Sequence, residues 1–275
     1  MKRAGPVAAL AAILVITVVA WLYILQLAAA PAAASGMDMA SMSGMDTTNM
    51  AGMDMTGMDM AGMASDASPW GLPEWAGLFT MWTVMMVAMM LPTATPSILL
   101  FQRVTQQRRG DAATLPVALF TSGYLLAWAG FSAVAATAQW QIHNLTFIAL
   151  VGDRTRGLLS GLLLLAAGWY QWTPLKAACL SRCRSPLSLF MGRWPEGGGA
   201  TLVLGIRHGA DCVACCALLM TLLFVGGVMN LMWVAGLAVL VLLEKLMPRG
   251  ALIGRLAGVG LMVWGLAAVL GSWRS

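Results

Sequence analysis

Long apolar runs separated by short polar connections dominate the chain. Their cores lie at 6–27, 75–91, 115–138, 157–172, 201–225, 229–247 and 251–270. A helix that crosses the hydrocarbon layer of a membrane needs about 20 mainly apolar residues, and these runs are close to that length. The pattern therefore predicts an all-α polytopic transmembrane bundle of about seven spans.

Three regions follow from this pattern. Residues 1–28 read as a signal anchor or a signal peptide, because Lys2 and Arg3 precede the first apolar run and small residues at 28–34 offer a cleavage site. Both readings stay open, and we expect the uncleaved anchor. Residues 29–74 form an exported segment, and 75–271 form the multi-span membrane domain.

Lys and Arg gather in alternate connections between the runs, which predicts the orientation. With Lys2 and Arg3 in the cytoplasm, the cytoplasmic connections also hold Arg103, Arg108, Arg109, Lys176, Arg182, Arg184, Arg193, Lys245 and Arg249. The exported segments hold only Arg154, Arg156 and Arg274. We therefore expect a multi-pass protein of the inner (cytoplasmic) membrane, with a cytoplasmic N-terminus unless the first run is cleaved.

Composition agrees with lipid as the main partner. Hydrophobic residues make up 60% and charged residues 10% of the 275 positions, whereas soluble domains have about 45–50% and about 25%. The net charge of +5 lies in the connections, so we expect no nucleic-acid partner. The chain shows no catalytic triad and no phosphate-binding loop, which favours a transporter or delivery protein over an enzyme. The sequence does not fix the oligomeric state.

The second run contains two prolines, Pro92 and Pro96. Proline removes a backbone donor and disfavours a straight helix. The stretch 91–100 is either a broken helix, as in transporter binding sites, or a simple kink.

The exported segment repeats a Gly-Met-Asp-Met unit and has no aliphatic β-branched residue, leucine or aromatic residue between 37 and 63. Such a segment cannot bury a core, and we expect it to be disordered. Thioethers are soft, neutral ligands that select Cu(I) and need no deprotonation. An inert flexible tail is the alternative. The repeated methionines considered as ligands are Met37, Met39, Met53, Met55, Met58 and Met60.

Polar and sulfur-bearing residues interrupt the apolar run at 201–225. His208, Cys212 and Cys216 repeat every four residues, and Asp211 and Cys215 form an adjoining stripe. Ionisable groups inside a span are expensive and point into the bundle. We expect the five side chains to share one metal ion or a redox role, with Asp211 as ligand or as the group that orients His208. Gly205 and Gly209 would admit a neighbouring helix closely.

Two further sets of soft ligands occur. Cys179 and Cys183 lie in a basic stretch where Arg182 and Arg184 would lower the thiol pKa. They would form a transient metal site or a redox pair. In the second run, Met85 and Met89 belong to a methionine stripe that either packs the core or passes Cu(I) inward.

These motifs together resemble the bacterial predicted metal-binding integral membrane proteins, domain-of-unknown-function family 2182. The resemblance covers about 75–270. It rests on 85–92, 170–176, Cys179, Cys183-Arg184, Cys212-x2-Cys215-Cys216, 227–231 and Glu244-Lys245. It implies a multi-span membrane fold and a metal role, and supplies no activity. Asp211 and Ala214 stand where that family often has an aromatic residue and a glycine.

Two functional hypotheses remain. The first is a membrane protein that binds and moves or delivers a soft metal ion, with Cu(I) favoured by the ligand set. Its partner would be a copper chaperone or a copper-dependent membrane protein. The second is a membrane thiol–disulfide oxidoreductase that uses the two Cys clusters.

Overall fold

The computed structural model describes residues 4–42, 71–144, 153–184 and 195–273. Every regular element in these ranges is helical, as predicted for the fold class, and no strand occurs in them. The elements are α1 (Ala4–Met42), α3 (Leu72–Arg109), η3 (Gly110–Ala113), α4 (Thr114–Asn144), α5 (Asp153–Tyr170), α6 (Pro174–Arg184), α8 (Gly198–Thr221), α9 (Leu223–Gly226), α10 (Leu231–Leu246) and α11 (Gly250–Ser272).

Five helices within the described ranges are long and apolar enough to cross a membrane. They contain Val7–Ala29, Leu72–Arg108, Thr114–Ile142, Gly198–Gly226 and Gly250–Ser272. The other two predicted spans are helical but shorter: the apolar part of α5 is Gly157–Tyr170, and α10 has 16 residues. The fold is therefore that expected of a multi-pass membrane protein, with five full-length candidate spans rather than about seven.

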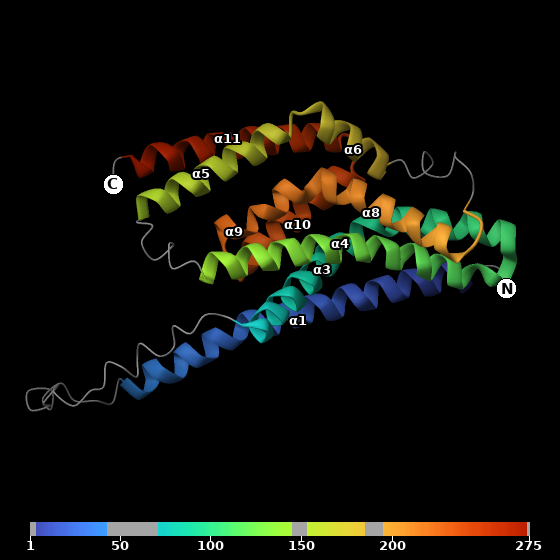
Figure 1. Cartoon of the computed structure of the whole chain (residues 1–275), viewed down its shortest axis with the longest axis horizontal. Helices are drawn as coiled ribbons and strands as arrows, with labels where there is room; N and C mark the ends of the chain where they lie inside the picture. The colour runs from blue at the N-terminus through green and yellow to red at the C-terminus, as the bar shows by residue number, and fades with distance from the viewer. Residues whose placement is uncertain (1–3, 43–70, 145–152, 185–194, 274–275) are drawn as a thin grey trace, which may run out of the picture.

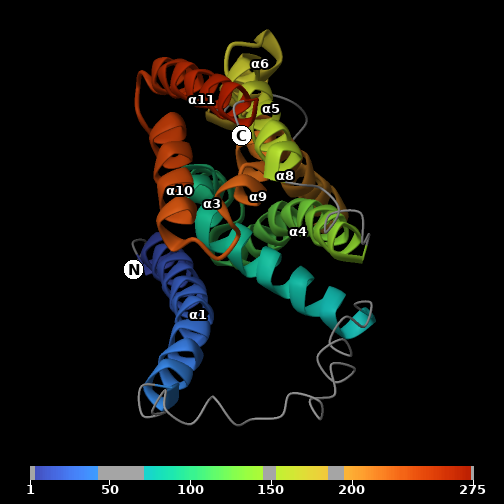
Figure 2. The same ribbon diagram turned by 90° about the vertical axis from the view of Figure 1, so that its left-hand side faces the viewer.

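The helices lie in two groups that Figures 1 and 2 show from two sides. Helices α5 and α11 form a long antiparallel pair, whereas α1, α3, α4 and α8 pack together in a second group. Helix α10 lies beside α3 and contacts α11, and the short helix α6 packs on α8. The middle of the molecule is therefore enclosed by α3, α4, α6, α8 and α10.

Glycines set the closest helix approaches. A Cβ atom on Gly205 would overlap the Phe120 carbonyl oxygen, so α8 and α4 meet almost backbone to backbone. Gly209 faces Tyr124 of α4 in the same way, which confirms the predicted role of the two α8 glycines. In the other group, a Cβ on Gly168 would lie 2.7 Å from the carbonyl oxygen of Gly258 in α11.

Helix α3 is continuous through both prolines, so the alternative of a broken helix at 91–100 is wrong. Two hydroxyl groups bind one carbonyl oxygen of this segment: Thr93 Oγ1 donates to the Met90 oxygen at 2.8 Å, and Tyr124 Oη donates to the same oxygen at 3.1 Å. The second of these bonds ties α3 to α4 next to Pro92.

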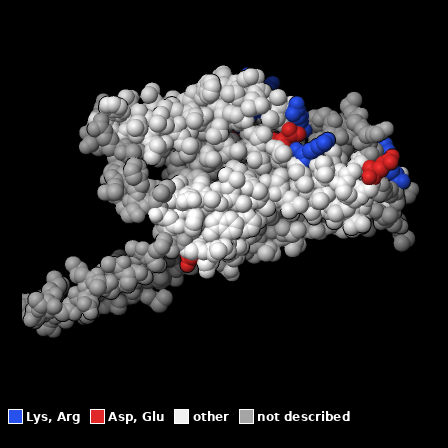
Figure 3. All heavy atoms as spheres, in the orientation of Figure 1, with Lys and Arg blue, Asp and Glu red and all other residues white. Residues whose placement is uncertain are grey.

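Most charged atoms on the face shown in Figure 3 gather toward one end of the molecule, and the middle is almost uncharged. The start of α1, the connection from α3 to α4 and helix α6 also lie toward that end in Figure 1. This arrangement places the predicted cytoplasmic connections on one side. Two of their basic residues are not loop residues, however: Lys176 is 3% exposed and Lys245 is 7% exposed.

The methionine-rich segment that the sequence predicts to be exported is mostly outside the described residues. Helix α1 continues through Met37 and Met39 to Met42, so the backbone there is helical rather than irregular. Met53, Met55, Met58 and Met60 lie outside the described residues.

Candidate metal centre

Four thiols meet in the interior between α8 and α6. Cys212, Cys215 and Cys216 occupy positions i, i+3 and i+4 of α8, which places them on one face of that helix. Cys183, near the end of α6, lies close to Cys212 and Cys215. Cys215 Sγ lies 3.2 Å from Cys216 Sγ. We call Cys183, Cys212, Cys215 and Cys216 the thiol cluster; none of its members is in a disulfide.

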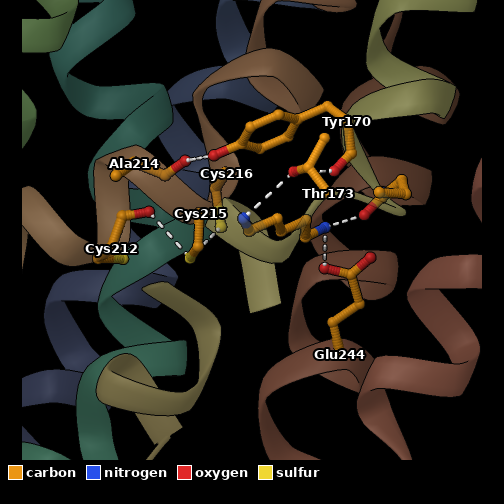
Figure 4. Close-up of polar contacts among 9 residues, drawn as sticks. Tyr170, Thr173, Cys212, Ala214, Cys215, Cys216 and Glu244 are labelled. Atoms are coloured by element: carbon orange, nitrogen blue, oxygen red, sulfur yellow. Dashed lines mark hydrogen bonds and ion pairs between the residues drawn. The ribbon is translucent and has the colours of Figure 1, made fainter. Parts of the chain in front are cut away.

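The thiol cluster is shielded from solvent and lipid. The exposed fractions are 0% for Cys212, 1% for Cys215, 1% for Cys216 and 9% for Cys183. Cys215 Sγ also donates to the carbonyl oxygen of Cys212 at 3.1 Å, one turn earlier on α8 (Figure 4). The sulfurs therefore point into the bundle, as the helical spacing predicted.

Two other helices direct polar groups at Cys212, and a third, α3, holds the lysine through Thr93. Lys245 Nζ of α10 lies 2.8 Å from Cys212 Sγ and 3.2 Å from Thr93 Oγ1 of α3. Tyr124 Oη of α4 lies 3.1 Å from the same sulfur. Buried charges in proteins are paired, and no carboxylate among the described side chains forms an ion pair with Lys245. Cys212 is therefore the group that the geometry offers as the partner of this ammonium.

A second buried polar group lies next to the thiol cluster. Lys176 of α6 forms an ion pair of 2.8 Å with Glu244 of α10 and a hydrogen bond with Gln171, and both charged side chains are almost fully buried (Figure 4). Tyr170 Oη donates to the Ala214 carbonyl at 2.6 Å, which ties the end of α5 to the thiol-bearing part of α8. These contacts fix the position of α6, and with it Cys183.

His208 lies in the bundle and faces aromatic rings. It is 1% exposed, and its ring centroid lies 5.8 Å from both Phe120 and Tyr124 of α4. Its Nδ1 atom has no hydrogen-bond partner among the described atoms. The structure thus places His208 one turn from Cys212, with Nδ1 unpartnered among the described atoms.

Asp211 does not face the thiol cluster. Its side chain is 25% exposed and lies 3.7 Å from Arg182 of α6. Among the described residues no hydrogen bond or ion pair joins Asp211 to His208, so the predicted orienting contact is not formed. Consistent with this, no group of three or more His, Cys, Asp or Glu side chains within the described ranges has the geometry of a ready metal site.

The two cysteines of the predicted Cys179/Cys183 pair have different neighbours. Cys183 joins the thiol cluster, whereas Cys179 lies near Asp211 and Arg182. Burial raises the pKa of Cys179, and the nearby Asp211 raises this pKa further. The nearby Cys212 raises the pKa of Cys183. Arg182 lowers the pKa of Cys179, as predicted, but burial and Asp211 outweigh it, so the net shift is upward.

Methionines of α3 line the core beside this centre. Met85 and Met89 are each 2% exposed, and Met86 and Met90 are fully buried. They pack in the same apolar core as the thiol cluster and Met220 of α8. The backbone of Met90 is linked to Cys212 through the Tyr124 hydroxyl. The core thus holds thioethers and thiols together, which is a donor set suited to a soft cation.

This combination defines a helical protein of the membrane type with a buried sulfur-rich centre. The chain belongs to the copper chaperone family PpoB2, whose family model matches residues 79–268. The match includes every member of the thiol cluster and supports a copper-related role, which the soft ligand set predicted; it does not confirm the family name that the resemblance suggested. Comparisons with curated proteins and with solved structures give no match.

Sequence reasoning missed three residues of this centre. Lys245 was read as an orientation signal in a connection, and Tyr124 and Thr93 carried no motif. The adjacent opposite charges Glu244 and Lys245 at the end of an apolar run were the available indication, since ionisable groups inside a span mark functional positions. Both are buried, and they point to different partners, Lys176 and Cys212.

Proposed function

We propose that this protein is a membrane-embedded delivery protein for Cu(I), which is its cargo. The thiol cluster would receive the ion inside the bundle and pass it to a copper-dependent membrane protein. The observation that carries this proposal is the meeting of four buried thiols from two helices, within the part of the chain that matches a copper chaperone family. Soft thiolate and thioether ligands select Cu(I) over hard cations.

The hydrogen-bonded arrangement of the thiols suits a site that binds a metal ion and releases it again. Cys215 and Cys216 contact each other, and Cys215 also uses the Cys212 carbonyl. Copper entry would replace these weak contacts with metal–sulfur bonds and release thiol protons. Because Cys183 comes from a separate short helix, a small shift of α6 changes the number of sulfurs available. An adaptable ligand number is what a delivery protein requires.

Lys245 supplies the charge for such a centre. Two thiolates around one Cu(I) carry a net negative charge, and a buried negative charge needs a partner. The ammonium of Lys245, held by Thr93 at 3.2 Å and lying 2.8 Å from Cys212 Sγ, is placed to balance it. A fixed cation of this kind favours a monovalent ion over a divalent ion, since the complex of Cu(I) with two thiolates becomes neutral with Lys245 included.

Methionines would bring the ion to the thiols. In this proposal the exported repeats that include Met37, Met39, Met53, Met55, Met58 and Met60 capture Cu(I), and the buried Met85 and Met89 pass it inward. Their burial in the same core as the thiol cluster supports the second step. His208, one turn from Cys212 with an unpartnered Nδ1, is the candidate nitrogen ligand.

The test is a copper titration of the purified full-length protein. The unmodified protein should bind Cu(I) in competition with a chromogenic chelator, and the variant Cys212→Ala/Cys215→Ala/Cys216→Ala should lose this binding. Cys179→Ala is the matched control, because it removes a buried thiol of α6 that lies outside the thiol cluster. Equal copper affinity of the triple variant and the control would refute the proposal.

The alternative of a thiol–disulfide oxidoreductase has one observation in its favour, the contact of Cys183 with Cys212 and Cys215 across two helices. It requires that a Cys183 disulfide accumulate when cells are exposed to an oxidant. Thiol trapping that finds all five cysteines reduced under those conditions would exclude it.

A further inference from the structure

A large groove lies on the side of the bundle away from α6. It is about 1260 Å³ in volume and runs between α1, α3, η3 and α4. Its walls are contributed by α1 residues from Ala8 to Ile16, by α3 between Leu91 and Gln107, and by α4 between Thr114 and Leu125. No part of the proposed copper route uses this groove.

The groove changes from apolar to polar along its length. Leu91 and Ile98 of α3 and Leu125 of α4 line the part nearer the middle of these helices. Gln106 and Gln107 line the part nearer the connection from α3 to α4. Residues 91 and 107 are about 24 Å apart along α3 at 1.5 Å per residue. A molecule that fits this groove therefore has a polar end and a long apolar end.

Two side chains at the polar end of the groove are available to bind a ligand. Gln102 is 6% exposed, lines the groove, and its Oε1 atom has no hydrogen-bond partner among the described atoms. A buried amide without a partner is destabilising, so a missing hydrogen-bond donor is expected there. Arg103, the next residue, also lines the groove, and no described carboxylate forms an ion pair with it.

We propose that this groove binds one anionic phospholipid of the surrounding membrane, with a glycerol headgroup. The phosphate would lie at Arg103, a headgroup hydroxyl would donate to Gln102 Oε1, and an acyl chain would lie along Ile98, Leu91 and α1. A guanidinium matches the geometry and charge of a phosphate. Basic pockets between membrane helices on the cytoplasmic side are also where anionic headgroups bind.

The chemistry of the groove favours a lipid over a partner helix or a water-soluble anion. An apolar transmembrane helix of a partner would leave the Gln102 oxygen without a donor and Arg103 without an anion, and a water-soluble anion would leave the apolar part empty. A lipid satisfies both ends. By filling the space between α1 and the pair α3/α4, it would also hold the first helix to the bundle.

The experiment measures lipid retained by the full-length protein in native mass spectrometry. The protein is purified in mild detergent and incubated with equal amounts of phosphatidylglycerol and phosphatidylcholine. We expect one phosphatidylglycerol per chain to remain, and Arg103→Gln to reduce its affinity about fivefold, the effect of one basic residue near a membrane surface. Arg207→Gln is the control, because Arg207 is exposed on α8 outside the groove.

A second pair of variants tests the apolar end. Ala118→Trp places a ring in the groove and should abolish retention, whereas Ala267→Trp on the exposed face of α11 should not. Gln102→Leu should reduce the preference for phosphatidylglycerol over phosphatidic acid, which lacks the glycerol hydroxyls. Equal retention of phosphatidylcholine and phosphatidylglycerol, or loss of lipid to the same degree in Arg103→Gln and Arg207→Gln, would overturn the proposal.

Discussion

The ammonium nitrogen of Lys245 lies 2.8 Å from the sulfur of Cys212, and both side chains are buried. The two residues come from α10 and α8, and are 33 positions apart in the sequence. Their contact joins the charge of one helix to the thiol cluster of another. It gives the proposed copper centre a fixed positive charge that is not a metal ligand.

Replacing Lys245 should weaken copper binding without removing any ligand. Lys245→Met leaves the complex of Cu(I) with two thiolates without its charge partner, and loss of a supporting residue typically lowers metal affinity 10–100-fold. Lys245→Arg keeps the charge and should retain most of the affinity. Competition titrations with a Cu(I) chelator measure both variants. An affinity of Lys245→Met equal to that of the unmodified protein would show that the ammonium plays no part.

The ion pair between Lys176 and Glu244 should be a stability element rather than a copper ligand. Lys176→Met leaves the Glu244 carboxylate buried without a cation, which typically destabilises a protein by about 3–5 kcal/mol. The double variant Lys176→Met/Glu244→Leu removes both charges and should recover much of this loss. Thermal unfolding in detergent, followed by circular dichroism, gives the comparison. Equal stability of the single and double variants would contradict the assignment.

Close contact between α4 and α8 predicts a position-specific effect of alanine. Gly205→Ala places a methyl group against the Phe120 carbonyl and must separate the two helices. It should lower both the unfolding temperature and copper binding, because Cys212 lies two turns further along α8. Gly199 lies in the same helix, but a Cβ atom added there meets no atom within 4 Å. Gly199→Ala should therefore leave the stability of the protein unchanged or raise it slightly. Thermal unfolding of the two variants that shows no difference would argue against tight packing here.

Thiol reactivity should report the environment of α6. Burial raises the pKa of Cys179, so this thiol stays protonated at neutral pH and ionises only as pH rises through the raised value. In a variant with Cys179 as the sole cysteine, alkylation at neutral pH should be slower than in the unfolded chain, and the rate should still be increasing above pH 9, beyond the ordinary value for cysteine. A rate already constant at pH 8 would mean that Arg182 outweighs burial.

Helical periodicity predicted the fold class and the face of α8 that carries the thiols. Positions 208, 212 and 216 repeat at the spacing of one helix face, and all three side chains are buried. Periodicity did not predict the environment of Asp211. This residue lies on α8 beside the buried face, and its partly exposed side chain pairs with Arg182. Periodicity along one helix cannot tell which neighbour covers each side.

Partners from distant parts of the chain could not be read from spacing. The spacing pairs Cys183 with Cys179, and it gives no sign that the fold also brings Cys183 to Cys212 and Cys215 of α8. Lys245 resembled a cytoplasmic anchor because it ends an apolar run, and only the packing of α10 against α3 and α8 turns it inward. Tyr124 and Thr93 have no distinguishing pattern at all, since their role depends on the sulfur that they surround.

The central claim is that sulfur atoms of the thiol cluster hold Cu(I) inside the bundle. Copper K-edge X-ray absorption of the purified full-length protein loaded with one Cu(I) per chain tests it most directly. We expect a first coordination shell dominated by sulfur, which disappears in Cys212→Ala/Cys215→Ala/Cys216→Ala and persists in Cys179→Ala. A shell of oxygen and nitrogen, or a sulfur shell unchanged in the triple variant, would contradict it.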